Sequence, residues 1–330
     1  MAEVTLSNLS KSFGATQALR GVSMTIPDGA FVVLLGPTGA GKTTTLRLIA
    51  GLEKPDTGDV RITGASVVND TPAQRDVAMV FQQYSLYPHL SVRDNLAFPL
   101  RSPMIRMPED QIARRVREVA EVLRIPHKLD NKATALSGGE MQRVSIGRAL
   151  VRNPRIYLMD EPLSSLDAKL RADLRVELKR IHQDLGATFL YVTHDQIEAM
   201  TMATHVGVLD QGRLVQFGTP REIYENPVST YVASRLGQPH INLLPADAFP
   251  GAPHGAATIG LRPEHIITGE GKAAIIQRIE HLGDQTRLHL TLGPYALVTL
   301  TDPHSTLAPG ETLHIRPLNP LWFDRDGNRI

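Results

Sequence analysis

Two short segments of this chain have the residue types needed to bind a phosphate group. The first matches the complete phosphate-loop pattern and reads Gly36-Pro37-Thr38-Gly39-Ala40-Gly41-Lys42-Thr43. Its glycines let backbone N–H groups point at phosphate oxygens, and the helix expected from Thr44 adds partial positive charge at its N-terminus. We expect Lys42 to reach the outer phosphates and the Thr43 hydroxyl to bind Mg²⁺. This segment therefore predicts a site for a nucleoside triphosphate.

The second segment, Leu136-Ser137-Gly138-Gly139-Glu140, has two glycines and a hydroxyl at an expected helix start. Because it has no lysine, it is suited to completing a phosphate site rather than to founding one. A full loop and a half-site in one chain suggest a site that is shared between two copies of the protein.

Two adjacent acids are candidates for metal binding and catalysis. Asp160 and Glu161 follow the apolar run 156–159. An acid at the end of a buried strand is the expected Mg²⁺-site partner of a phosphate loop, and this role falls to Asp160. Glu161 is then the candidate that polarises the attacking water. A loop with two solvated acids is the alternative, and the phosphate loop in the same chain favours the metal site.

Three further side chains are open to two interpretations each. His194 follows another apolar run and is either a hydrogen-bonded structural residue or a contact for the γ-phosphate. Gln82 comes at the end of residues 77–81 and is either an ordinary loop residue or a Mg²⁺ ligand. Phe13 is either a core aromatic or a platform for a stacked base. Stacking of a base on an aromatic ring typically contributes roughly 1–3 kcal/mol to the free energy of binding.

The hydrophobic pattern predicts an α/β core that positions these residues. Residues 31–35, 156–159 and 188–192 are continuous apolar runs, as in strands buried on both faces of a parallel sheet. Residues 108–123 and 167–185 have helical spacing with mixed charges. Each run ends at a polar residue, which places the candidate site at the carboxyl edge of the sheet. Before this core, residues 4–26 are expected to form antiparallel strands.

The last third of the chain has a different pattern. A hairpin is expected over residues 206–217, followed by a helix start at Thr219-Pro220-Arg221-Glu222. Residues 237–253 are then rich in proline, glycine and alanine. Short apolar runs separated by turn residues follow at 273–279, 286–292, 296–300 and 312–315. This spacing predicts a small β-barrel, so we expect domains at residues 1–235 and 236–330.

Composition limits the classes of function. With 330 residues, of which 42% are hydrophobic and 21% charged, the chain is large enough for one large domain and a smaller one. The net charge of +1 argues against a dedicated nucleic-acid binder, and the lack of cysteine excludes disulfides. No secretory signal is visible, and the apolar runs are far shorter than the roughly 18 residues of a membrane span. A role at a membrane would therefore require a partner that anchors the protein.

Taken together, the motifs resemble those of the ATP-binding subunits of ABC transporters. The signature helix of that family begins LSGGQ, where this chain has residues 136–140 with Glu140 in place of the glutamine. The other matching motifs follow in family order and are Phe13, Gln82, Leu158-Met159-Asp160-Glu161-Pro162, Ser164-Ser165-Leu166-Asp167 and His194. The resemblance spans residues 1 to about 235.

This resemblance implies a P-loop ABC-type ATPase domain with a helical subdomain at about residues 85–155, and ATP and Mg²⁺ as cofactors. It also implies a head-to-tail homodimer, with ATP held between the phosphate loop of one copy and the segment Ser137-Gly138-Gly139 of the other. Glu140 would then place a carboxylate near the ribose or the phosphates. The remaining implied roles are base stacking by Phe13, Mg²⁺ binding by Thr43, Gln82 and Asp160, water activation by Glu161, and γ-phosphate sensing by His194.

Two more segments resemble importer ATPases of the maltose and glycerol-phosphate type. The segment from Gln82 to Val92 is similar to the one that docks permease subunits, and residues 260–265 are similar to the opening of a C-terminal OB-like regulatory barrel. The resemblance implies a bacterial importer of carbohydrate-type solutes. The homodimer would lie peripherally on the cytoplasmic face of the inner membrane, beneath two permease subunits served by a solute-binding protein, with no nucleic acid as partner.

Two other classes stay open as alternatives. One is an importer ATPase for sulfate, molybdate, iron or polyamines, because such subunits also carry C-terminal barrels. The other is a soluble ABC-type ATPase that acts on nucleic acid or ribosomes. The single set of ATPase motifs and the lack of a basic tail argue against the second class.

Overall fold

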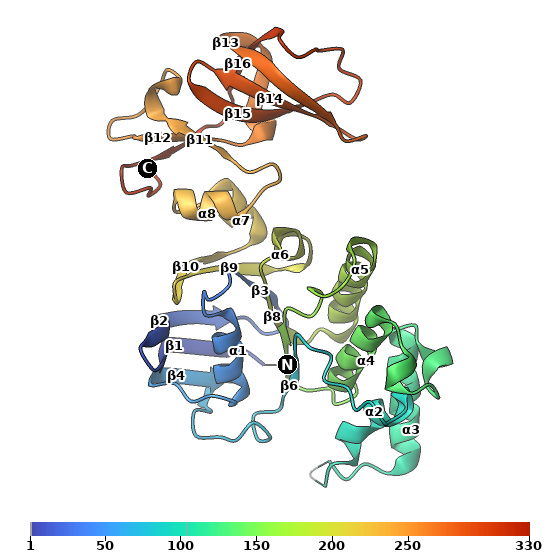
Figure 1. The fold of residues 1–330 in the computed structure, drawn as a ribbon. Helices are drawn as coiled ribbons and strands as arrows, with labels where there is room; N and C mark the ends of the chain where they lie inside the picture. The colour runs from blue at the N-terminus through green and yellow to red at the C-terminus, as the bar shows by residue number, and fades with distance from the viewer. Residues whose placement is uncertain (1, 104) are drawn as a thin grey trace. The chain divides into compact units, whose positions relative to one another are not determined.

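The computed structural model describes residues 2–103 and 105–330, which form two compact units (Figure 1). The first unit ends at Pro220 and the second runs from Arg221 to Ile330. The second unit therefore includes residues 221–235, which the sequence analysis placed in the first domain. The division at 235–236 stays a prediction about the limits of the functional domains.

The first unit is built on a six-stranded sheet of order β10-β9-β3-β8-β7-β6. Its parallel strands are β3 (Phe31–Leu35), β6 (Val77–Val80), β7 (Ile156–Asp160), β8 (Thr188–Thr193) and β9 (His205–Asp210). Every residue of β3, β7 and β8 is buried, because elements cover both faces of the sheet. The expected buried strands are therefore confirmed. The expected hairpin is also confirmed, since β10 (Arg213–Gly218) pairs antiparallel with β9.

A second sheet of the same unit has the order β2-β1-β4-β5. It consists of β1 (Val4–Phe13), β2 (Thr16–Ile26), β4 (Thr57–Ile62) and β5 (Ala65–Ser66), all paired antiparallel. Helix α1 (Lys42–Ala50) contributes Leu46 and Ile49 to a core that also contains Leu6 of β1 and Leu34 of β3. The helix that follows the phosphate loop is thus fixed between the two sheets.

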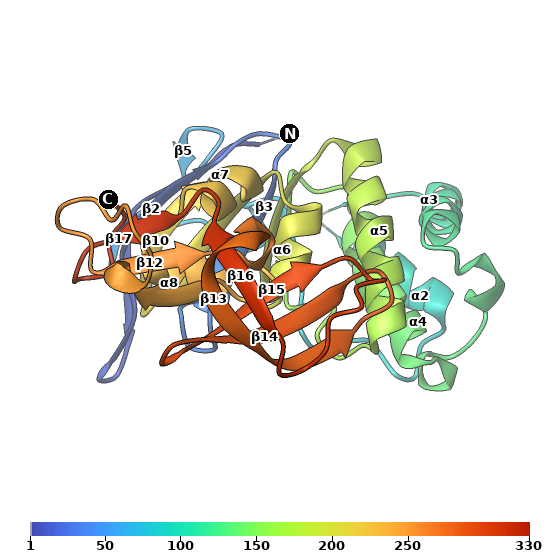
Figure 2. The same cartoon turned by 90° about the horizontal axis from the view of Figure 1, so that it is seen from above.

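The remaining helices of the unit lie on the other side of the six-stranded sheet from β1 and β2 (Figures 1 and 2). They include α2 (Val92–Ala97), α3 (Glu109–Val122) and α4 (Gly138–Leu150), joined by the short 3-10 turns η1 (Phe98–Arg101), η2 (Pro126–Lys128) and η3 (Ala133–Ala135). Helix α5 (Ala168–Leu185) begins at Asp167, whose side chain accepts a hydrogen bond from the Leu170 amide, and α6 (Gln196–Met202) follows β8. Both helices expected from spacing, α3 and α5, are confirmed.

The second unit contains two antiparallel sheets, β11-β12-β17 and β15-β14-β13-β16. Helices α7 (Pro220–Glu225) and α8 (Thr230–Arg235) precede them. The strands and short turns are β11 (Asn242–Pro245), η4 (Ala246–Ala248), β12 (Thr258–Leu261), η5 (Pro263–His265), β13 (Ile266–His281), β14 (Thr286–Leu292), β15 (Tyr295–Thr301), β16 (Thr312–Pro317) and β17 (Leu321–Phe323). Ile259 from the first sheet and Ile276 and Leu290 from the second share one core. The four expected strands are confirmed as β13 to β16, whereas β11, β12 and β17 were not anticipated.

None of the helices in residues 2–103 and 105–330 is long and apolar enough to cross a membrane.

Candidate functional site

The phosphate loop, residues 36–43, joins β3 to α1. It contains two glycines at positions where a side chain would clash with neighbouring backbone atoms. A Cβ on Gly36 would lie 2.5 Å from the Leu209 carbonyl oxygen, and one on Gly41 would lie 2.6 Å from the Ala18 oxygen. Gly41 also has φ 99°, in the left-handed region, and is the N-cap of α1. Among the described residues, no side chain caps this helix and no acid lies in its first turn. Its N-terminal amides are therefore available to an anionic ligand.

Lys42 lies inside this loop and is only 5% exposed. Its ammonium donates hydrogen bonds to the carbonyl oxygens of Gly36 at 2.9 Å and Pro37 at 3.0 Å. It also lies 3.5 Å from a carboxylate oxygen of Glu161. The charge is thus fixed where the outer phosphates of a bound nucleotide would need it.

Thr43 and Asp160 meet at the carboxyl edge of the sheet, although they are far apart in sequence. The Thr43 hydroxyl donates a 2.8 Å hydrogen bond to Asp160 Oδ1. Burial raises the pKa of the Asp160 carboxyl above its usual value, and the Thr43 hydrogen bond partly opposes this shift. A hydroxyl and a buried carboxylate are hard oxygen donors of the kind that Mg²⁺ prefers, and a cation beside Asp160 would offset the cost of burying its charge. The donor set therefore fits Mg²⁺.

Glu161 adopts an unusual backbone conformation that holds its side chain between two cationic or ionisable groups. Its φ is +42°, a region that non-glycine residues rarely adopt, and its amide donates to the Val192 carbonyl at 3.1 Å. The carboxylate lies 3.0 Å from His194 Nδ1 and 3.5 Å from Lys42 Nζ. The backbone and side-chain hydroxyl of Ser164 both donate to the Glu161 carbonyl. The backbone of Glu161 is therefore fixed by hydrogen bonds, and its carboxylate lies beside Lys42 of the phosphate loop and His194.

The two other nucleotide-site candidates lie at the surface. Phe13 is the last residue of β1 and is 44% exposed, with the Lys11 ammonium 5.4 Å from the centroid of its ring. Its ring is therefore not part of the core, and its face is open to a stacking partner. Gln82 is exposed in the segment after β6. The structure brings Lys42, Thr43, Asp160, Glu161 and His194 together and leaves these two at the periphery.

The half-site at residues 136–140 forms the start of α4, and it is capped by its own side chains. Ser137 is the N-cap, and its hydroxyl accepts from the Glu140 amide. Glu140 Oε2 in turn accepts from the Ser137 amide at 2.8 Å and from its hydroxyl at 3.0 Å. The other carboxylate oxygen lies 3.1 Å from the Lys128 ammonium. The carboxylate expected near ribose or phosphates is thus engaged within its own chain.

The two glycines of this half-site are packed against other elements. A Cβ on Gly138 would lie 3.2 Å from the Tyr84 hydroxyl, and one on Gly139 would lie 2.2 Å from a methyl of Leu170. The Tyr84 hydroxyl itself lies 3.1 Å from the Ser165 hydroxyl. The signature helix, the segment after β6 and the turn before α5 therefore meet at one point of this unit.

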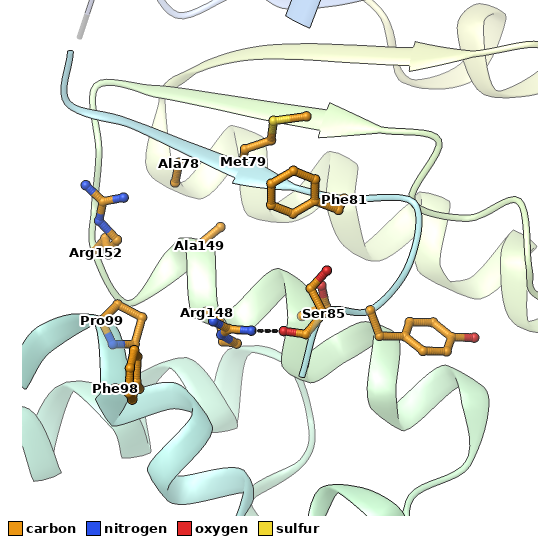
Figure 3. Close-up of a pocket in the computed structure, with 11 residues that line it drawn as sticks. Ala78, Met79, Phe81, Ser85, Phe98, Pro99, Arg148, Ala149 and Arg152 are labelled. Carbon is orange, nitrogen blue, oxygen red and sulfur yellow. Dashed lines mark hydrogen bonds between the residues drawn. The ribbon is translucent and has the colours of Figure 1, made fainter. Parts of the chain in front are cut away.

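Two residues of the segment from Gln82 to Val92, Tyr84 and Ser85, line an apolar cavity of about 260 Å³, of which Figure 3 labels Ser85. The lining includes Met79, Phe81, Phe98 and Pro99. A neighbouring cavity of about 720 Å³ shares Met79, Phe81 and Pro99 with it. Phe81 and Phe98 are 39% and 49% exposed, so this region presents apolar surface to solvent.

Sequence reasoning missed the residues that shape this segment. Arg148 of α4 donates to the Ser85 carbonyl, and its guanidinium lies over the Tyr87 ring at 4.7 Å. The buried side chain of Asn95 accepts from the Tyr87 amide at 2.9 Å and donates to the Tyr87 carbonyl at 3.1 Å. No local pattern reveals such contacts, because they join residues of different elements.

Comparisons with known proteins agree with this geometry. The family model described as ABC transporter matches residues 19–164, and the TOBE domain model matches residues 259–319. The chain is 47% identical to the sn-glycerol-3-phosphate import ATP-binding protein UgpC of Rhizobium meliloti, over 100% of both chains. It is 48% identical to the protein of the same name from Ruegeria pomeroyi, over 88% of this chain and 86% of the relative. An uncharacterized ABC transporter ATP-binding protein of Sinorhizobium fredii is 44% identical over 96% and 91%.

Solved structures give the same family. The cbiO1 protein of Clostridium perfringens, part of an ABC transporter complex, superposes with a TM-score of 0.63 at 27% identity, over 68% of this chain and 90% of that one. A dimeric bacterial ABC transporter cassette superposes with a TM-score of 0.60 at 30% identity, over 66% and 99%. The expected ABC ATPase fold with a C-terminal OB-like domain is therefore confirmed. This chain belongs to the ATP-binding proteins of ABC transporters and is an ATP hydrolase of that family.

Proposed function

We propose that this chain is the ATP-hydrolysing subunit of a bacterial importer for carbohydrate-type solutes, with a glycerol phosphate as the first solute to test. The observation that carries this proposal is the 43–48% identity, over most of the chain, to relatives named as sn-glycerol-3-phosphate import ATP-binding proteins. The OB-like C-terminal domain and the apolar surface beside residues 82–92 are consistent with it.

In this proposal the phosphate loop and three residues outside it have defined tasks. Lys42 and the amides of residues 36–43 bind the phosphates of ATP, and Phe13 stacks on the base. Thr43, Asp160 and Gln82 hold Mg²⁺, which neutralises phosphate charge when it is bound. The loop carbonyls that now accept from Lys42 keep its ammonium aimed into the loop.

Glu161 acts as the general base in this proposal. Its carboxylate takes the proton of the attacking water, and contacts with His194 and Lys42 orient its two oxygens. His194 lies 3.0 Å from this carboxylate and contacts the γ-phosphate from the same edge of the sheet. The pair His194–Glu161 therefore links recognition of the γ-phosphate to activation of the water.

The nucleotide site is completed by a second copy of the chain. The start of α4, with Ser137, Gly138 and Gly139, supplies hydroxyl and amide donors to the γ-phosphate held by the other copy. The dimeric cassette among the structural relatives supports this arrangement. We further propose that the dimer lies on the cytoplasmic face of the inner membrane. There, residues 82–92 of each copy would dock two permease subunits, and a solute-binding protein would deliver the solute to the permease.

Substituting the proposed base tests the mechanism. We expect Glu161→Gln to keep ATP binding and to lower turnover by roughly 10²- to 10⁴-fold, because an amide cannot accept the proton. Glu118→Gln, an exposed change on α3 that also removes one negative charge, serves as the matched control. Turnover at the rate of the unaltered protein in Glu161→Gln would exclude Glu161 as the base.

The solute is tested through the partners. The permease that copurifies with the chain identifies the transporter, and its solute-binding protein is then titrated with glycerol phosphate, with sugars and polyols, and with sulfate. Preference for sulfate over all the carbohydrate-type solutes would contradict the proposed class.

A further inference from the structure

A charged side chain stands where the signature motif of the family has a neutral one, and a lysine of a neighbouring turn pairs with it. Glu140 is the third residue of α4, and Lys128 is the last residue of η2. One Glu140 oxygen holds Ser137 through its amide and hydroxyl, and the other lies 3.1 Å from the Lys128 ammonium. Both side chains are about three-quarters buried, so this ion pair is partly shielded from solvent.

This carboxylate is ionised at neutral pH. The Ser137 amide first, and Lys128 and the Ser137 hydroxyl after it, hold the pKa of Glu140 below its usual value. A full negative charge therefore lies beside the amides and the hydroxyl that the proposed function assigns to the γ-phosphate of a second copy. Like charges repel, so an uncompensated carboxylate there would oppose the approach of that triphosphate.

We propose that Lys128 is a positioning residue that neutralises Glu140 and so permits two copies of the chain to close on ATP. The ammonium lies 3.1 Å from one oxygen of the carboxylate and so holds that oxygen toward η2. It acts through Glu140 and does not touch the nucleotide. The inference rests on the proposed function, because it assumes that the start of α4 meets the ATP of another copy.

The experiment measures ATP binding by a single copy separately from ATP-dependent dimer formation. In the Glu161→Gln background, which is expected to trap bound ATP, the fraction of dimer is measured by light scattering as ATP is titrated. The affinity of the single copy for ATP is measured separately at protein concentrations too low for dimers. The variants are Lys128→Met, Lys128→Arg and the double variant Lys128→Met with Glu140→Gln. Arg93→Met is the matched control, because it removes a cation of the same helical region that pairs with Asp130 at 2.7 Å.

We expect Lys128→Met to raise the ATP concentration for half-maximal dimer by about five- to tenfold, from the loss of one partly buried charge pair at each of two sites. The affinity of the single copy and the behaviour of Arg93→Met should not change. Lys128→Arg should keep normal closure because it keeps the charge. The double variant should recover closure, because the neutral amide that Glu140→Gln introduces needs no compensation.

The rescue distinguishes this role from simple support of the fold. Normal closure in Lys128→Met, or a double variant that closes as poorly as Lys128→Met, would overturn the inference and leave the proposed function intact. A parent protein that binds ATP without ever forming a dimer would overturn the two-copy site, and this inference with it.

Discussion

The molecule has two glycine-containing helix starts to which we assign phosphate binding, and the backbone amides of the two starts differ in their partners. Helix α1 begins at Gly41 with no side-chain cap from the described residues and no acid in its first turn. Helix α4 begins at Ser137 with a complete capping box, in which Ser137 and Glu140 accept from each other's amides. The first start is left open for a ligand, whereas the second is satisfied by its own chain.

The backbone conformations of the two helix starts also differ. The phosphate loop contains Gly39 at φ 82° and Gly41 at φ 99°, both in the left-handed region. Ser137 has φ −69° and ψ 163°, the ordinary extended conformation of an N-cap residue. The backbone of the α1 start therefore leaves its amides free of side-chain caps from the described part of the chain. The α4 start is an ordinary capped helix end, and under the proposed function it would exchange internal hydrogen bonds for ligand contacts when a second copy brings the nucleotide.

The largest expected effect comes from removing the cation of the open start. Lys42→Met should abolish measurable ATP binding and lower turnover by 10³-fold or more, on the order of the loss of a main electrostatic stabiliser of the phosphates. Binding of a fluorescent ATP analogue and phosphate release measure the two effects. Lys54→Met, an exposed position after α1, is the charge-matched control. If Lys42→Met retained full affinity for ATP, the open start would not be the primary phosphate site.

The capped start should respond differently to loss of its hydroxyl. Ser137→Ala should leave ATP binding by a single copy unchanged and lower turnover by roughly 10- to 100-fold, because one donor to the γ-phosphate is lost. It should also lower the free energy of unfolding by about 1 kcal/mol through loss of the cap. Ser137→Asn restores capping without restoring the hydroxyl. Full turnover in Ser137→Asn would show that the serine acts only as a helix cap.

The sequence predicted the elements whose signal is local. The run Phe31-Val32-Val33-Leu34-Leu35 is continuous and apolar because β3 is buried on both faces, so its place in a parallel sheet could be inferred. The strand order β9-β3-β8-β7-β6 could not, because it depends on pairing between distant residues. Strand β17, only three residues long, pairs with β12 about 60 residues earlier, and neither has a repeating pattern long enough to detect.

The same division holds for the candidate site. The types of Lys42, Thr43 and Asp160 were sufficient to predict their meeting at one sheet edge, where the structure has the 2.8 Å contact of Thr43 with Asp160. The capping box also had a local signal, since Ser137 and Glu140 fit the S-x-x-E pattern, but it was not among the predicted features. The Lys128–Glu140 pair had no such signal, because it joins two elements through side chains.

Gly139 gives a second test of the capped start. Its lack of a side chain leaves room for Leu170 of α5 as well as for a ligand. Gly139→Ala should lower the free energy of unfolding by about 1 kcal/mol, since the new Cβ would lie 2.2 Å from a methyl of the partly exposed Leu170 side chain, which must shift to make room. Adding Leu170→Ala should recover much of this loss, as measured by chemical denaturation. An unaltered stability in Gly139→Ala would contradict the tight packing.

The smallest expected effect is a pH dependence that belongs to the capped start alone. The folded state lowers the pKa of Glu140 from 4.5, so its contribution to stability is present above that value and is lost as the pH falls through the lower folded pKa. Relative to Glu140→Gln, the unaltered protein should therefore lose less than about 1 kcal/mol of unfolding free energy between pH 6 and pH 3. The Ser137 amide is the first cause of the shift and Lys128 a later one, so Lys128→Met should retain most of this dependence. If Lys128→Met removed it entirely, the ion pair rather than the capping box would hold the start of α4.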